Sequence, residues 1–259
     1  MPLENHAEFK LSITKALGDQ LASALADLTP APLTMENIQS LRQLPGVYQL
    51  YKGTDLVYVG KAERSLPRRI ERHLRKLSGR TNVDMAEMAF TCLYVDEDFG
   101  AVAPERLLIN KHRGLGEVPW NYNGFGNNDP GKRRDTTEVD VAHFDRAYPI
   151  DLEFKLAELL GTEPAMDDTI SLALLLSSMK TALPYVFRYE PSKEFEDIRV
   201  PWPHEGITAD EVLRIAASHL PNPWQITALP GYVIMYRKQE EYPSARRYYR
   251  EDAVIDVTE

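Results

Sequence analysis

The amino-acid sequence predicts an α+β protein, in which a small sheet and its flanking helices form an α/β sandwich. Two short apolar runs, 47–51 and 56–59, flank a turn and are typical of a β-hairpin. Apolar residues then recur at helical spacing over 66–77, which indicates an amphipathic helix. A β-rich run at 89–95 follows. Together these predict a mixed or antiparallel central sheet flanked by helices.

Two helices are expected before the hairpin. Residues 6–28 carry apolar side chains near helical spacing, and Pro30 and Pro32 end that pattern. A shorter helix is expected at 34–41. Residues 1–34 are therefore predicted to form an N-terminal helical arm, which packs on the core or on a second subunit.

A further helix is expected after the third strand, at 103–112, with Pro104 in its first turn. Glu105 lies at the start of this helix, where the helix dipole favours a carboxylate. Residues 114–137 are too rich in Gly, Asn, Pro and charge for a regular element. Long loops of this kind are often functional. The core domain is predicted to span 35–149 and to include this loop.

Residues 150–259 have a different character and are predicted to form a second α+β region. Helices are expected at 168–182 and 208–219, and a hairpin is expected at 224–237. We find no catalytic constellation in this region.

The chain is acidic overall, but basic charge is concentrated in one stretch. Its formal net charge of −9 and pI near 5.3 argue against indiscriminate binding to nucleic acid. Only two glutamates oppose the cations between 61 and 80. Those cations are Lys61, Arg64, Arg68, Arg69, Arg72, Arg75, Lys76 and Arg80. A local surface for phosphate therefore remains possible in an acidic protein.

Cysteine content and hydropathy indicate the compartment. The lone cysteine, Cys92, excludes intrachain disulfides and a cysteine-rich zinc site. The first ten residues lack the apolar segment of a secretory signal, and no run of about 18 apolar residues exists. We therefore expect a cytoplasmic protein with no membrane partner.

Two tyrosines in the hairpin, Tyr48 and Tyr58, are candidate catalytic residues. A three-residue hairpin loop at 52–54 would place them opposite each other, whereas a slip of one residue would send them to opposite faces of the sheet. Arg69 and His73 are four residues apart and share one face of the expected helix. The sequence therefore predicts two phenols on one face of the hairpin, and a guanidinium and an imidazole on one face of the helix.

The order of these residues resembles the GIY-YIG nuclease superfamily. The first motif is Gly46-Val47-Tyr48, the second is Tyr58-Val59-Gly60, and Arg69 and His73 follow on the helix. The family's usual spacing between glycine and arginine is one residue shorter than that from Gly60 to Arg69. Arg68 fits the shorter count, but only Arg69 lies four residues before a histidine.

The resemblance implies a role for each residue. Tyr48 would act as general base or orient water, Tyr58 would position water or phosphate, and His73 would assist proton transfer. A nearby cation (the metal, Arg69 or Lys61) would favour the phenolate. The resemblance implies two further roles, a metal ligand and a residue that supports the site.

The resemblance also implies a glutamate that binds a divalent metal, for which Glu105 is the candidate and Mg²⁺ or Mn²⁺ the expected ion. A late asparagine is expected to brace the site. Asn121 is the first candidate, and Asn110 and Asn123 remain open.

Within the superfamily, the chain resembles the restriction endonucleases related to the SacII isoschizomers, which cut CCGCGG. The matching segments, over roughly 35–150, are GVYQLY, VYVGKAERSLPRRIERHLRK, PERLLI and WNYNGFGNNDPGKRRD. This implies a type II, sequence-specific endonuclease that cuts double-stranded DNA at a palindromic site as a homodimer or tetramer. A structure-specific repair nuclease and an inactive DNA-binding module remain alternatives.

Two groups of cations are expected to contact DNA phosphates. The first group is Lys61, Arg68 and Arg72, and the second is Lys132, Arg133 and Arg134. Trp120, Tyr122 and Phe125 would give the loop a surface for stacking or wedging. Alternatively, Trp120 and Phe125 only pin the loop to the protein. Residues 150–259 would read DNA, hold subunits together, or both.

Overall fold

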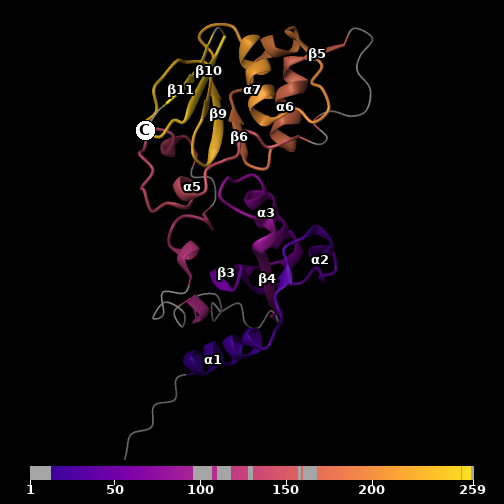
Figure 1. Ribbon diagram of the computed structural model, residues 1–259, viewed down its shortest axis with the longest axis vertical. Coiled ribbons are helices and arrows are strands. Elements are labelled where there is room, and N and C mark those ends of the chain that lie inside the picture. The colour runs from indigo at the N-terminus through magenta and orange to yellow at the C-terminus, as the bar shows by residue number, and fades with distance from the viewer. Residues whose placement is uncertain are drawn as a thin grey trace, which may run out of the picture. The chain divides into compact units, whose positions relative to one another are not determined.

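The computed structural model describes residues 13–95, 107–109, 118–127, 131–156, 159, 168–251 and 253–257. The chain forms two compact units (Figure 1). The first comprises residues 1–72 and 84–122, and the second comprises residues 73–83 and 123–259. The domains expected at 35–149 and 150–259 have different bounds from these two compact units. The expected domain division stays a prediction.

The first unit is a small antiparallel sheet with helices. Its elements are α1 (Ile13–Ala26), β1 (Ala31–Pro32), α2 (Met35–Gln39), β2 (Gly46–Lys52), β3 (Asp55–Ala62), the first part of α3 (Leu66–Ser78), a 3-10 turn (Met85–Glu87), β4 (Met88–Tyr94) and η3 (Pro119–Asn121). The strand order is β1-β4-β2-β3, and every pairing is antiparallel. The expected α+β class is confirmed, with hairpin, helix and third strand in the predicted order.

Side chains from β2 and β3 alternate between two faces of the sheet. Val47 and Val59 belong to a buried cluster with Leu25 of α1. On the other face, the position of Gly46 leaves room for Leu66 at the start of α3. The two helices therefore cover opposite faces, and the tyrosines of the hairpin lie on the α3 face.

The hairpin register differs from the expected one. Lys52 pairs with Asp55, so the turn has two residues rather than three, and Gly53 adopts a positive φ of 59°. The register then shifts between Leu50 and Tyr51, as in a β-bulge. As a result Tyr48 lies opposite Gly60, not opposite Tyr58 as predicted.

The bulge explains why the tyrosines still share a face. A two-residue turn continued without a shift would pair Tyr48 with Val59, and that register sends the two phenols to opposite faces. One extra residue in β3, Val57, restores the parity. Tyr48 and Tyr58 then become diagonal neighbours on the same face.

The helices of the first unit are close to those predicted. Helix α1 matches the helix expected at 6–28, whose first part lies outside the described residues. Helix α2 begins after Thr34, whose hydroxyl accepts a hydrogen bond from the Asn37 amide. Of the helix expected at 103–112, the described residues 107–109 are helical.

The second unit contains a five-stranded sheet covered by two helices. Its elements are the last part of α3, η4 (Lys132–Arg134), α5 (Phe144–Ala147), β5 (Thr169–Ser171), α6 (Leu172–Ala182), β6 (Val186–Tyr189), η5 (Lys193–Glu196), β7 (Arg199–Pro201), α7 (Ala209–Ser218), β8 (Gln225–Ala228), β9 (Tyr232–Tyr236), β10 (Arg247–Arg250) and β11 (Ala253–Asp256). The sheet order is β11-β10-β8-β9-β6, and β6 runs parallel to β9. The hairpin expected at 224–237 is confirmed as β8 and β9.

One predicted helix begins later than expected. Residues Thr169–Ser171 pair with Arg199–Pro201 as a two-stranded ribbon, and Ser171 then caps α6. Helix α7 agrees with the expected helix at 208–219. Both helices contribute to the main apolar core of the unit. None of the described helices is long and apolar enough to cross a membrane.

Candidate active site

The phenols of Tyr48 and Tyr58 lie together on the α3 face of the first unit. Their ring centroids are 6.1 Å apart and the rings are tilted by 43°. Both residues are buried, with 0% of Tyr48 and 4% of Tyr58 exposed. The predicted pair is therefore present, although the register that brings it about is not the predicted one.

Gly60 makes room for the ring of Tyr48. A Cβ on Gly60 would lie under 3.0 Å from the Cζ, Oη and Cε1 atoms of Tyr48. Because the two residues are opposite each other in the hairpin, the ring of Tyr48 crosses its neighbouring strand at this glycine. The glycine of the second motif thus serves the tyrosine of the first.

Arg69 is the cation that contacts the phenols. Its Nε donates a hydrogen bond of 3.2 Å to the hydroxyl oxygen of Tyr48. Partial burial by itself would lower the pKa of Arg69, but electrostatic and hydrogen-bond contacts with Tyr48 and Tyr58 outweigh it and raise the pKa. Arg69 therefore stays fully charged beside the two phenols.

Arg68 and Lys61 do not share this environment. Arg68 is exposed, and its backbone N–H donates a hydrogen bond to the hydroxyl oxygen of Ser65, which caps the helix. Lys61 pairs with Val47 and so occupies the opposite face of the sheet from Tyr48, with its Nζ 3.9 Å from Glu63. Of the two side chains expected as a cation beside the phenols, Arg69 holds that place and Lys61 does not.

Asn121 bridges the outer edge of β3. Its Nδ2 donates to the carbonyl of Val59, and its Oδ1 accepts from the N–H of the same residue, both at 2.8 Å. Strand β3 is an edge strand, so these backbone groups have no neighbouring strand to pair with. The amide of Asn121 takes the place of a strand at the residue between Tyr58 and Gly60.

His73 follows Arg69 by four residues in the same helix and belongs to the second unit. Its ring stacks on Phe125 with centroids 4.9 Å apart, and only 5% of the residue is exposed. Lys76, one turn further, donates to the carbonyl of Phe125 at 2.7 Å. The histidine is therefore a buried, stacked side chain rather than a surface residue of the helix.

The three cations of the loop differ from one another. The Nζ of Lys132 lies 2.6 Å from Glu190, and an NH2 group of Arg134 lies 3.1 Å from Asp145. Arg133 is exposed. All three were predicted to contact phosphate, but Lys132 and Arg134 have acidic partners inside the second unit.

The aromatic residues of the loop also differ from the expectation. Trp120 and Phe125 are buried, with 2% and 1% exposed, so neither offers a surface for stacking. The predicted role of these two residues is wrong in the described chain, because their apolar rings anchor the loop instead. Tyr122 is 56% exposed and keeps the predicted accessibility. Arg72 of the helix is exposed as well.

Two buried carboxylates were missed by the sequence reasoning. Asp145 contacts Arg80 at 3.0 Å and Arg134 at 3.1 Å, while Arg80 also donates to the carbonyl of Tyr148. The alternation of Arg and Asp in the loop was only a weak indication of buried ion pairs. The sequence does not show which residues pair, because ion pairs between distant residues depend on the fold.

The second missed carboxylate is Asp135. It accepts hydrogen bonds from Tyr232 at 2.8 Å and Tyr236 at 2.9 Å, and it pairs with Arg188. Burial and the bond to Asp135 raise the pKa of Tyr236 to about 12. These contacts attach the loop to the C-terminal sheet.

The expected metal ligand, Glu105, lies outside the described residues, as does Asn110. Within the described ranges no group of three or more His, Cys, Asp or Glu residues could hold a metal ion. A single carboxylate with water and phosphate oxygens remains compatible with Mg²⁺, which keeps several waters in its coordination shell.

The cluster of two phenols and a guanidinium is built on a β-hairpin and the helix that follows it. Residues 51–159 match the family model of the Eco29kI GIY-YIG domain. The matched segment contains the second motif, Arg69, His73, Glu105 and Asn121, and it supports the GIY-YIG superfamily, a nuclease that acts on DNA, and the use of a divalent metal. A search of curated proteins finds no match to the chain.

Proposed function

We propose that this protein is a restriction-type endonuclease, which hydrolyses phosphodiester bonds of double-stranded DNA at a specific site. The observation that carries the proposal is the hydrogen bond from Arg69 to Tyr48, beside Tyr58, on the braced hairpin. A half-buried guanidinium beside two phenols is an arrangement that can bind a phosphate oxygen. The family match to a restriction-type nuclease domain supports the same activity.

Phosphodiester hydrolysis needs an activated water, charge stabilisation at the phosphorus and help for the leaving oxygen. Arg69 would pair with a non-bridging oxygen through its planar guanidinium, and it is held in place by Tyr48. Tyr48 would orient the water or take its proton, and Tyr58 would position the water or the phosphate. His73 would assist proton transfer.

Asn121 would act as a positioning residue. Both ends of its amide are used on the backbone of Val59, so it supports the strand between the tyrosine and the glycine of the second motif. Its effect on catalysis would therefore pass through the position of Tyr58.

Glu105 would hold the Mg²⁺ ion, for which a single protein carboxylate with waters and phosphate oxygens is a common shell. When bound, the ion supplies positive charge at the phosphate and makes water a better nucleophile. Manganese would substitute for it, since both ions prefer oxygen ligands.

We further propose that the substrate site is palindromic and that a homodimer, or a tetramer, cuts both strands. Two-fold symmetric proteins match palindromic DNA, with one subunit acting on each strand. The sequence CCGCGG is the first site to test, because of the likeness of the core segments to the SacII isoschizomers.

Plasmid cleavage tests the proposal. The protein is incubated with plasmids that contain or lack CCGCGG, with Mg²⁺, Mn²⁺ or EDTA, and the product ends are sequenced. Discrete bands with one common end sequence are expected with metal. Cuts only at branched or damaged DNA would indicate a repair nuclease, and specific binding without cleavage would indicate an inactive module.

A Glu105→Gln variant is the matched control for that assay. It should lose cleavage while its DNA affinity stays within a few-fold of wild type, because the change removes a charge but keeps the shape of the side chain. Full activity of Glu105→Gln with Mg²⁺ would contradict the assignment of the metal ligand.

A further inference from the structure

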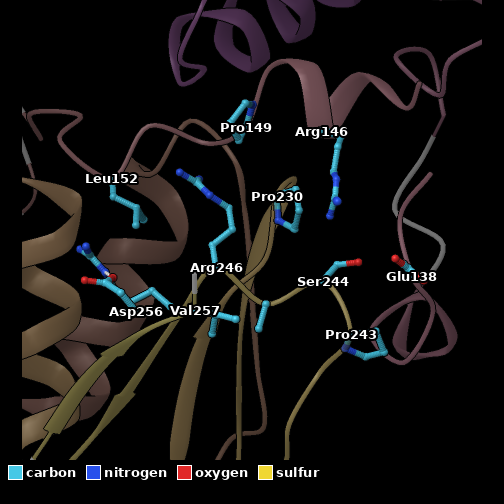
Figure 2. Close-up of a pocket in the computed structure, with 12 residues that line it drawn as sticks. Glu138, Arg146, Pro149, Leu152, Pro230, Pro243, Ser244, Arg246, Asp256 and Val257 are labelled. Carbon is cyan, nitrogen blue, oxygen red and sulfur yellow. Dashed lines mark hydrogen bonds and ion pairs between the residues drawn. The ribbon is translucent and has the colours of Figure 1, made fainter. Parts of the chain in front are cut away.

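The second unit contains a cavity of about 530 Å³ at the base of its C-terminal sheet. Residues of α5, of the β8–β9 turn, of the segment before β10 and of the end of β11 line it. Figure 2 shows two arginine side chains of this cavity: Arg146 extends from α5 and Arg246 from the segment just before β10, with Pro230 between them in this view. The cavity is thus lined by cations and by apolar proline rings.

Arg246 is a half-buried cation that forms no ion pair with the described carboxylates. Its NH1 donates to the carbonyl of Ile150 at 2.8 Å. Within the described ranges no carboxylate lies within 4.0 Å of its guanidinium. Burial, and then the neighbouring charge of Arg247, lower the pKa of Arg246. The environment therefore disfavours the charge of Arg246, and the more distant charge of Asp151 offsets this only in part.

The next residue, Arg247, has carboxylate partners for its charge. Its guanidinium pairs with Asp210 and with Asp256, and these contacts raise its pKa. Both arginines belong to the wall of one cavity. Of these two neighbouring arginines, Arg247 has carboxylate partners and Arg246 forms no ion pair within the described ranges, so an anion that enters would pair with Arg246.

Other groups of the wall fit an oxyanion. The hydroxyl oxygen of Ser244 accepts the N–H of Val139 at 2.8 Å, so its own proton remains a donor. Arg146 adds a second guanidinium from a different element. The acids of the wall are Asp256, which is paired with Arg247, and Glu138, which is exposed.

We propose that this cavity binds a phosphate group through Arg246 and Arg146, with Ser244 as a further donor. Guanidinium groups pair with phosphate oxygens in bidentate fashion, which suits a dianion or a phosphodiester better than a carboxylate on a flexible chain. The volume exceeds that of one phosphate, and the prolines of the wall can pack against an attached sugar. The phosphate belongs either to the DNA backbone, a source that rests on the proposed function, or to a free phosphate compound.

Binding of inorganic phosphate tests the site directly. The thermal midpoint and the heat of binding of the full chain are measured against phosphate concentration, at an ionic strength held constant with chloride. Saturable binding is expected, and Arg246→Gln should weaken it at least tenfold, whereas Arg246→Lys should keep part of it. Arg250→Gln is the matched control, because Arg250 ends β10, the strand that follows Arg246, bonds Gln225 and does not line the cavity.

A second variant protects the test against misfolding. If Arg246→Gln does not fold, Arg146→Gln is measured instead and should weaken phosphate binding at least fivefold. The proposal is overturned if the wild-type chain shows no saturable phosphate binding and Arg246→Gln does not alter duplex affinity. It is overturned equally if the wild-type chain binds phosphate but Arg246→Gln, or Arg146→Gln in its place, binds it as tightly.

Duplex DNA in EDTA distinguishes the two sources of phosphate. If the ligand is the DNA backbone, Arg246→Gln should weaken duplex binding and lower the salt slope by about 0.9, and free phosphate should compete with the duplex. If duplex affinity stays unchanged while phosphate affinity falls, the ligand is a free phosphate compound. Neither readout requires cleavage, so a failure here is separable from a failure of the proposed nuclease activity.

Discussion

The ring of Tyr48 occupies the space that a side chain on Gly60 would need. This places the tyrosine of the first motif directly across from the glycine of the second in the β2–β3 hairpin. The two motifs are therefore one structural unit, in which a missing Cβ on one strand admits a phenol from the other. The spacing of both motifs follows from this pairing.

Gly60→Ala should reduce cleavage at least about 100-fold, because a Cβ displaces the Tyr48 ring and an error of about 1 Å at a reacting group costs that much. Single-turnover cleavage and the thermal midpoint are measured together. Gly53→Asn is the control, since Gly53 has a positive φ that asparagine tolerates and open space around it. Equal rates for wild type and Gly60→Ala would show that the ring is not needed.

Arg69→Ala should lower the cleavage rate by about 10²–10³, as expected for the loss of one charged donor to the transition state. Arg68→Ala should change the rate much less, because its side chain is exposed and only Arg69 contacts Tyr48. Single-turnover rates at saturating enzyme separate chemistry from binding. The reverse ranking would mean that the shorter family spacing applies to this chain.

Asn121→Asp should destabilise the protein by about 1–3 kcal/mol, the cost of leaving buried backbone groups unsatisfied. The new carboxylate oxygen would face the carbonyl of Val59 in place of the amide donor. Urea unfolding measures the loss, and Asn127→Asp is the control because Asn127 is exposed in the same loop. A cleavage rate that falls in Asn121→Asp without any loss of stability would point to direct contact with substrate instead.

The loop cations should separate into one DNA contact and two structural pairs. Arg133→Ala should lower the slope of log affinity against log salt by about 0.9, the value for one phosphate contact. Arg134→Ala should instead destabilise the fold by about 1–3 kcal/mol, because Asp145 loses one buried partner. Lys132→Ala, whose partner is Glu190, should change neither quantity strongly, since exposed pairs contribute little. An unchanged salt slope in Arg133→Ala would make the loop structural.

His143 should make the stability of the protein depend on pH. Burial lowers the pKa of His143 below its ordinary value of 6.5. The carboxylate of Asp145 acts to raise this pKa, whereas the positive charges of Arg134, Lys76 and Arg80 act to lower it further. The unfolded chain then binds more protons than the folded one below about pH 6.5, so stability is full above that pH and falls as the pH drops. The same arginines would disfavour any further positive charge nearby.

His143→Asn is the variant that tests this dependence. Asparagine keeps the cap on the Asp145 amide but does not titrate. The unfolding free energy of wild type minus that of His143→Asn should therefore be larger at pH 7.5 than at pH 5.5. Urea midpoints at the two pH values measure it. A difference that does not change with pH would mean that His143 has an ordinary pKa in the folded chain.

Much of the fold followed from local patterns in the sequence. The strands β2, β3 and β4 and the helices α3 and α7 lie where apolar periodicity predicted them, because each buries one apolar face within a few residues along the chain. The motif residues Tyr48, Tyr58 and Arg69 were also identified from order and spacing. These are properties of short segments, and a single sequence determines them.

Three-dimensional packing alone decided the rest. The bulge at Val57 set the register, because one extra residue in a strand leaves no mark in the apolar pattern. The partners of Asn121, Asp135 and Asp145 come from residues tens of positions away, and Trp120 and Phe125 turned inward. The sequence determined which segments form elements, whereas the tertiary structure decided which side chains meet, since buried polar groups must find partners wherever the fold supplies them.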